Sequence, residues 1–73
     1  MTYDDDLDAL GLLCPLPVLK IRKRLQSMAA DAILRVQADD PAALIDIPHF
    51  CMETGHQLIE QTDHIYFIRK KSA

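Results

Sequence analysis

Gly11-Leu12-Leu13-Cys14-Pro15-Leu16-Pro17 is the stretch that decides the fold, because a short strand precedes it and an amphipathic helix follows it. Proline is favoured in the first turn of a helix, since its fixed φ suits the helix and its missing N–H would have no partner there. Pro15 and Pro17 therefore mark the start of the helix and put Cys14 at or beside its N-cap. Gly11 allows the tight turn that leads into the cysteine.

Cys14 is the candidate catalytic residue of the chain. Free backbone N–H groups and the positive end of the helix dipole point at the N-cap, and both favour a thiolate over a thiol. We therefore expect the pKa of Cys14 to lie below its ordinary value. A reactive cysteine of this kind is a nucleophile or a sulfur carrier. The alternative is a small residue that only caps the helix.

The composition is that of a small globular protein. The chain has 73 residues, so we expect one domain over 1–73, and its 49% apolar and 26% charged residues are ordinary values. The formal charge of −3 disfavours a general nucleic-acid binder. No run approaches the ~20 apolar residues of a membrane span, and the N-terminus is acidic where a secretory signal is basic. We expect a cytoplasmic protein without a membrane or stable nucleic-acid partner. The acidic run of Asp4, Asp5, Asp6 and Asp8 is typical of a solvated tail.

The first helix is expected over 15–28, where apolar residues recur at helical spacing and include Met28. Its other faces carry four cations, which are Lys20, Arg22, Lys23 and Arg24. These cations have two interpretations. They either form a solvated face that complements the helix dipole, or a basic docking surface beside Cys14 that attracts an acidic protein or a tRNA backbone.

The second helix is expected to start with Asp40 as N-cap and Pro41 at the first helical position. Pro48 falls inside the helical pattern, and an internal proline breaks or kinks a helix. We therefore expect one short turn, a kink, and a second segment over 48–54. Gly55 fits the position that ends this segment.

Strands complete the pattern. Leu7 and Ala9 indicate a short first strand, and further strands are expected over 32–38, 56–61 and 65–70, the last two joined as a hairpin. The order is β-α-β-α-β-β. Its natural solution is an α+β fold, a two-layer α/β sandwich in which a four-stranded mixed sheet carries two helices on one face.

Cys51 lies on the expected inner face of the second helix, so a small buried hydrophobe is its first interpretation. A resolving thiol or a metal ligand is the alternative. The histidines His49, His56 and His64 show no pairing spacing, and Cys51 with His49 or His56 supplies too few ligands for a metal. We expect no metal site and no cofactor.

The motifs together resemble a known family. The segment 7–17, Leu-Asp-Ala-Leu-Gly-Leu-Leu-Cys-Pro-Leu-Pro, is similar to the N-terminal signature of the TusA family of small sulfur-carrier proteins. The likeness continues through Ala-Asp-Asp-Pro-Ala at 38–42, Asp-Ile-Pro-His-Phe-Cys at 46–51, Gly-His at 55–56 and Tyr-Phe-Ile-Arg-Lys at 66–70. It covers nearly the whole chain in order.

The resemblance implies a two-layer α/β sandwich and a persulfide carrier, a sulfurtransferase without a cofactor. A cysteine desulfurase would load sulfur onto Cys14, and the carrier would pass it to a downstream relay protein. The best-known branch supplies 2-thiouridine in tRNA, whereas others serve cytoplasmic sulfur oxidation or the molybdenum cofactor. Leu13 stands where the family often has Arg or another polar residue. Cys51 matches a second family cysteine that carriage does not require. We expect a monomer when the protein is free.

Functions from other classes stay open at this point. The domain could be a non-catalytic protein-interaction module in which Cys14 is only a cap. It could also be a redox sensor in which Cys14 and Cys51 form a reversible disulfide.

Overall fold

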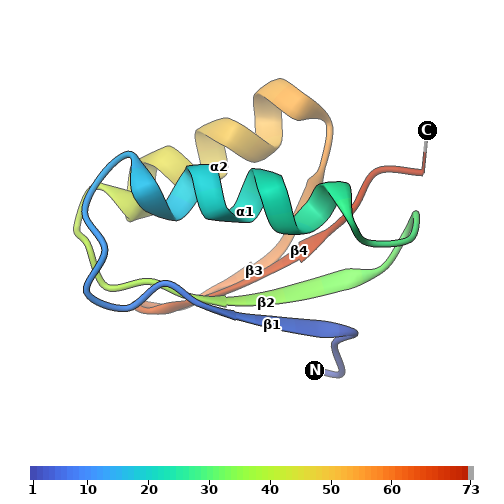
Figure 1. Cartoon of the computed structure of the whole chain (residues 1–73), viewed down its shortest axis with the longest axis horizontal. Coiled ribbons are helices and arrows are strands. Elements are labelled where there is room, and N and C mark those ends of the chain that lie inside the picture. Colours follow the sequence, from blue (N-terminus) through green and yellow to red (C-terminus); the bar gives the residue numbers. More distant parts are fainter. Residues whose placement is uncertain (73) are drawn as a thin grey trace.

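A four-stranded mixed sheet carries both helices on one face (Figure 1). The computed structural model describes residues 1–72. The elements in chain order are β1 (Asp5–Asp8), α1 (Leu16–Gln26), β2 (Ile33–Gln37), α2 (Ala43–Thr54), β3 (Gln57–Gln61) and β4 (Ile65–Arg69). The predicted β-α-β-α-β-β order and two-layer architecture are confirmed.

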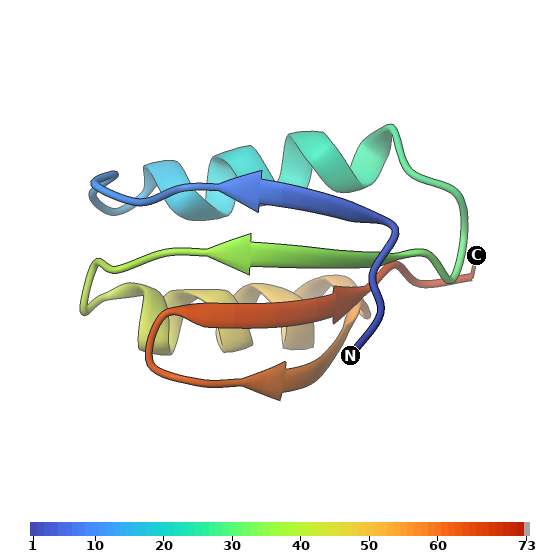
Figure 2. The same cartoon turned by 90° about the horizontal axis from the view of Figure 1, so that it is seen from below.

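The strands follow the order β1-β2-β4-β3 across the sheet (Figure 2). β1 is parallel to β2, with Leu7 opposite Val36, and α1 forms the crossover that a parallel pair requires. β4 is antiparallel to both of its neighbours. This pairing brings the loops after β1 and β2 to the same end of the molecule, where α1 and α2 begin.

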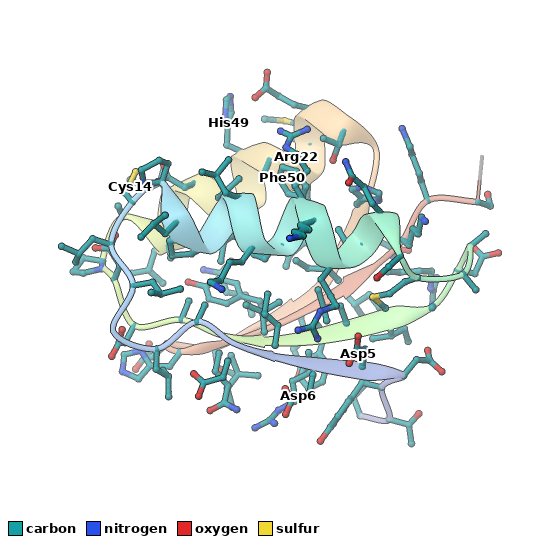
Figure 3. All side chains as sticks on the ribbon, viewed as in Figure 1. Asp5, Asp6, Cys14, Arg22, His49 and Phe50 are labelled. Carbon is teal, nitrogen blue, oxygen red and sulfur yellow. The ribbon has the colours of Figure 1, made fainter. Side chains whose placement is uncertain are left out.

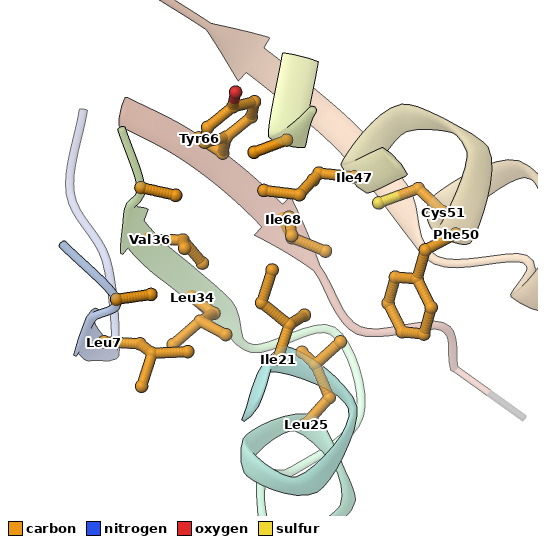
Figure 4. Packing of buried hydrophobic residues seen from close by; sticks show 13 residues of the cluster. Leu7, Ile21, Leu25, Leu34, Val36, Ile47, Phe50, Cys51, Tyr66 and Ile68 are labelled. Carbon is orange, nitrogen blue, oxygen red and sulfur yellow. The ribbon is translucent and has the colours of Figure 1, made fainter. Parts of the chain in front are cut away.

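The hydrophobic core lies between the sheet and the helices (Figure 4). Leu34 and Val36 alternate along β2 with half-exposed neighbours, so they share the face that the helices cover. Ile21 and Leu25 of α1 are buried against this face, which confirms the apolar stripe. The largest fully buried side chains are Tyr66, Ile21, Leu25, Leu34, Ile47, Ile68 and Val36. Neither helix in residues 1–72 is long and apolar enough to cross a membrane.

The second helix corrects a prediction. α2 continues without a break through Pro48 to Thr54, and its N-cap is Ala42 rather than Asp40. Proline removes one intrahelical hydrogen bond, and the burial of Ile47 and Phe50 on either side of Pro48 holds the helix to the core. Tertiary packing therefore overrides the local signal. Gly55 ends the helix as expected, with a φ of 87° in the left-handed region.

The acidic N-terminal stretch is more than a solvated tail, which corrects another expectation. Asp5 forms an ion pair of 3.2 Å with Arg24 of α1, and Asp6 forms one of 3.1 Å with Arg35 of β2. The guanidinium of Arg35 also lies 5.4 Å from the ring centroid of Tyr3. These contacts tie the edge strand β1 to the helix above it and to the strand beside it.

Candidate functional site

Cys14 lies exposed in the loop that joins β1 to α1 (Figure 3). α1 begins at Leu16 with Pro15 as its N-cap and Pro17 in its first turn, so the predicted helix start is confirmed within a residue. Gly11 has a φ of 78°, a conformation that glycine adopts without strain, as expected for the turn before the cysteine. The thiol is therefore presented at one end of the molecule by a short, turn-rich loop.

Two aspartates from the loop before α2 hold the cysteine loop in place. Asp39 accepts a hydrogen bond of 2.9 Å from the N–H of Gly11, and Asp40 accepts one of 2.7 Å from the N–H of Cys14. Asp40 also accepts the N–H of Ala42 at 3.3 Å. Hydrogen bonds to carboxylates are stronger than neutral ones. They couple the position of Cys14 to the start of α2.

A third carboxylate, that of Asp46, lines the same groove as the Cys14 thiol. Hydrogen bonding toward Asp46, burial, and the charges of Asp46 and Asp40 raise the pKa of Cys14 above its ordinary value. The expected depression of this pKa is therefore wrong. A negative charge beside a thiol disfavours the thiolate.

The helix N-terminus offers fewer free donors than expected. The N–H of Leu16 donates to the carbonyl of Leu13 at 2.8 Å, and Pro17 has no N–H. The N–H of Cys14 is taken by Asp40. Of the first turn only the N–H of Val18 is left, so the prolines that fix the helix start also remove the groups that would have stabilised a thiolate.

Asp40 and Asp46 were not predicted as site residues. The signal that could have found them is the Asp-Asp-Pro-Ala and Asp-Ile-Pro segments, which by themselves indicate a helix start and a kink and which also carry the TusA resemblance. Each lies far from Cys14 in the sequence, with 26 positions between Asp40 and Cys14. Only the folded arrangement of the two helix starts brings these carboxylates to the cysteine.

Asp46→Asn is expected to lower the pKa of Cys14, because it removes the charge that disfavours the thiolate. The rate of thiol alkylation against pH, measured in the Cys51→Ala background, should have a midpoint above that of a model cysteine peptide. The midpoint of the Asp46→Asn variant should lie at lower pH. Asp31→Asn, at an exposed turn, is the matched control. An unchanged midpoint in the Asp46 variant would show that this carboxylate does not act on the thiol.

Cys14 opens onto a groove of about 270 Å³ between α1 and α2, which we call the Cys14 groove. Arg22 of α1 and Asp46, His49 and Phe50 of α2 line it. Figure 3 shows Arg22, His49 and Phe50 on the two helices. His49 pairs with Glu53 one turn further along the helix, at 3.2 Å. The groove is open, and a donor or acceptor group can approach the thiol along it.

The comparisons with known proteins agree with this geometry. The family model described as sulfurtransferase TusA matches residues 5–70. The chain belongs to the TusA family of sulfur carriers. The sulfur carrier protein TusA of Pseudomonas syringae pv. syringae (strain B728a) is 42% identical over 76 residues, which cover 99% of this chain and 90% of the relative. TusA of Pseudomonas aeruginosa (strain LESB58) is 42% identical over 78 residues, 99% of either chain.

A solved structure supports the fold. The crystal structure of a SirA-like protein from Desulfitobacterium hafniense aligns with a TM-score of 0.67 over 90% of this chain and 93% of its own. Its sequence identity is 23%, so this likeness concerns the architecture alone. The two-layer sandwich that the TusA resemblance implied is therefore found both in the chain and in this structural neighbour.

The four cations of the first helix do not form one surface in this TusA-family chain. Arg22 lines the Cys14 groove, with its guanidinium 5.1 Å from the ring centroid of Phe50. Lys20, Lys23 and Arg24 line a different depression next to β1, and Arg24 is paired with Asp5. Successive helical positions turn by about 100°, so these residues divide between two faces. Beside Cys14 the predicted basic surface is reduced to Arg22.

Cys51 is buried on the inner side of α2 and is 3% exposed (Figure 4). Burial raises its pKa to about 11, so it stays a thiol at neutral pH. Within residues 1–72, no group of three or more His, Cys, Asp and Glu could hold a metal ion. In this TusA-family chain Cys51 therefore belongs to the core.

Cys51→Ala is expected to destabilise the fold by about 1 kcal/mol, from the lost packing of a small buried side chain. Urea unfolding measures this loss. Exposed Lys20→Ala serves as a surface control, with a change within about 0.5 kcal/mol. Equal stabilities of the wild type and Cys51→Ala would contradict a packing role for this thiol.

Proposed function

We propose that this protein is a persulfide carrier. Cys14 accepts sulfur from a cysteine desulfurase or a similar donor and passes it to a downstream relay protein. The observation that carries this proposal is the exposed Cys14 at the start of α1, with its backbone held by Asp40, in a chain of the TusA family. The second cysteine is buried, which leaves one thiol accessible to partners among residues 1–72.

The transfer step needs no oxidant. The Cys14 sulfur attacks the outer sulfur of the donor's cysteine persulfide, the S–S bond of the donor breaks, and the donor leaves as a thiolate. A persulfide and a thiol thus become a thiol and a persulfide, with Cys14 as the new carrier. Because the pKa of Cys14 is raised, its proton must be removed during attack, and we propose Asp46, which lines the same groove, as the base.

The proposed pathway is tRNA 2-thiouridine synthesis through protein relays. The alternatives are cytoplasmic sulfur oxidation and molybdenum cofactor supply. We propose protein partners rather than stable nucleic-acid binding, because the chain carries a formal charge of −3 and carboxylates surround Cys14. A free thiol on the surface fits a cytoplasmic location, where thiols stay reduced. We further propose that residues 1–73 act as one domain, monomeric when free and without a cofactor or membrane partner.

The test is the intact mass of the protein after incubation with a cysteine desulfurase, cysteine and pyridoxal phosphate. The wild type and Cys51→Ala should each gain one sulfur atom, and reductant should remove it. No gain with any desulfurase tried would favour a protein-interaction module. A reversible Cys14–Cys51 disulfide instead of a persulfide would favour a redox sensor.

A further inference from the structure

A second pocket continues the Cys14 groove toward the C-terminal end of α1. It measures about 330 Å³ and shares Arg22, Phe50 and Thr54 with the Cys14 groove. Beyond these residues it is lined by His56, Lys70 and Lys71. We call this the basic pocket, defined by its four basic side chains Arg22, His56, Lys70 and Lys71.

Among residues 1–72, no carboxylate forms an ion pair with these basic side chains. The ion pairs among residues 1–72 involve Arg24, Arg35 and His49, and none involves a residue of the basic pocket. Lys70 Nζ donates to the carbonyl of Met28 at 2.6 Å, and Arg22 stacks over Phe50. In a chain of formal charge −3, these cations gather without the acids that are abundant elsewhere.

The positive charges of the basic pocket act on the imidazole of His56. Burial, followed by the charges of Lys71, Lys70 and Arg22, lowers the pKa of His56 below its ordinary value. The Nδ1 of His56 accepts the backbone N–H of Lys71 at 3.0 Å, which leaves Nε2 as the protonated nitrogen of a neutral ring. The pocket thus offers a guanidinium, two ammonium groups and a ring N–H as donors, a set that matches a carboxylate.

We propose that the basic pocket binds the carboxylates of an acidic segment in the protein that exchanges sulfur with Cys14. This inference rests on the proposed function. The Cys14 groove and the basic pocket are continuous, because Arg22, Phe50 and Thr54 line both of them. One extended segment can therefore bring its reactive cysteine to Cys14 and its acidic residues to the basic pocket.

The length of α1 sets the spacing within that segment. α1 has 11 residues, so the helix is about 16 Å long at ~1.5 Å per residue. An extended chain covers this distance with about five residues. The acidic residues should therefore lie about five positions from the reactive cysteine of the partner.

The chemistry favours a peptide over a nucleic acid. Asp40 and Asp46 lie beside Cys14, and Glu53 is a further carboxylate that lines the Cys14 groove. A nucleic acid, with a phosphate at every nucleotide, would meet these carboxylates, and like charges repel. An acidic peptide segment can instead confine its negative charges to the part that contacts the basic pocket.

The binding test uses a fluorescent hexaglutamate peptide and fluorescence anisotropy at low salt. Lys71→Glu should weaken peptide binding about tenfold, whereas Lys20→Glu, the same charge change on the other side of α1, should weaken it less than about twofold. Lys71→Gln should give an intermediate loss. Both lysines are exposed, and thermal unfolding confirms that the variants fold. Equal effects of the two charge reversals would overturn the inference, and so would tighter binding of a single-stranded RNA hexamer than of hexaglutamate.

The transfer test separates this inference from the proposed function. Loading of Cys14 from a desulfurase that carries an acidic segment should slow about tenfold in Lys71→Glu and little in Lys20→Glu. Loading from inorganic polysulfide, which needs no docking, should be equal in the wild type and both variants. A wild type that no sulfur donor loads would contradict the proposed function itself. Normal polysulfide loading with equal desulfurase rates in both variants would overturn only the docking inference. Displacement of hexaglutamate by equimolar inorganic phosphate would also overturn it, since it would indicate a small-anion pocket.

Discussion

Cys14→Ser is expected to abolish sulfur loading from a cysteine desulfurase while leaving the free energy of unfolding within about 0.5 kcal/mol of the wild type. A serine hydroxyl cannot form the persulfide. The side chain is exposed, and the hydrogen bond from this residue to Asp40 comes from its backbone N–H, so the substitution keeps the loop contacts. Intact mass after the loading reaction and urea unfolding together measure both parts of the prediction.

Cys51→Ala is the matched control for Cys14→Ser, because it removes the other thiol of the chain. It should load sulfur like the wild type despite its loss of stability. A folded Cys51→Ala variant that no longer carries sulfur would contradict the single-cysteine mechanism. Residual loading of Cys14→Ser would mean that Cys51 becomes accessible to the donor.

Ile21→Ala is expected to destabilise the protein by about 3 kcal/mol, because it leaves a cavity between α1 and the sheet. Ile21 is 0% exposed and belongs to the cluster that joins α1 to β2 and β4. A small domain has a total stability of about 5–15 kcal/mol, so the loss is a large part of the whole. Urea unfolding with a two-state fit gives the value.

Lys20→Ala is the control for this change, since Lys20 precedes Ile21 on the exposed side of the same helix. Its effect should stay within about 0.5 kcal/mol. If Ile21→Ala lowered the free energy of unfolding no more than Lys20→Ala, the packing of Ile21 against the sheet would not hold α1, and with it Cys14, in place.

The architecture could be predicted from the sequence because its signals are local and periodic. Ile21 and Leu25 repeat at helical spacing, and Leu34 and Val36 alternate as a strand with one buried face requires. Gly55 ends α2 for a reason that belongs to a single residue, its freedom to adopt a positive φ. Such signals need no knowledge of distant parts of the chain.

Other features depend on contacts between distant segments. The break expected at Pro48 is absent because Ile47 and Phe50 are packed in the core, and propensity carries no information about that packing. The raised pKa of Cys14 comes from Asp46, which the fold of α2 brings to the cysteine. The basic pocket joins Arg22 of α1 to Lys70 and Lys71 near the other end of the sequence. Such neighbours can be identified only in the folded chain.

The position of the carried sulfur tests the central claim most directly. After loading, alkylation and digestion with trypsin, Cys14 lies in residues 1–20 and Cys51 in residues 36–69, so the two thiols fall in separate peptides. The added sulfur should be found on the alkylated persulfide of peptide 1–20, with peptide 36–69 carrying an ordinary thiol. Sulfur on peptide 36–69, or on neither peptide after loading by an active desulfurase, would contradict the assignment of Cys14 as the carrier.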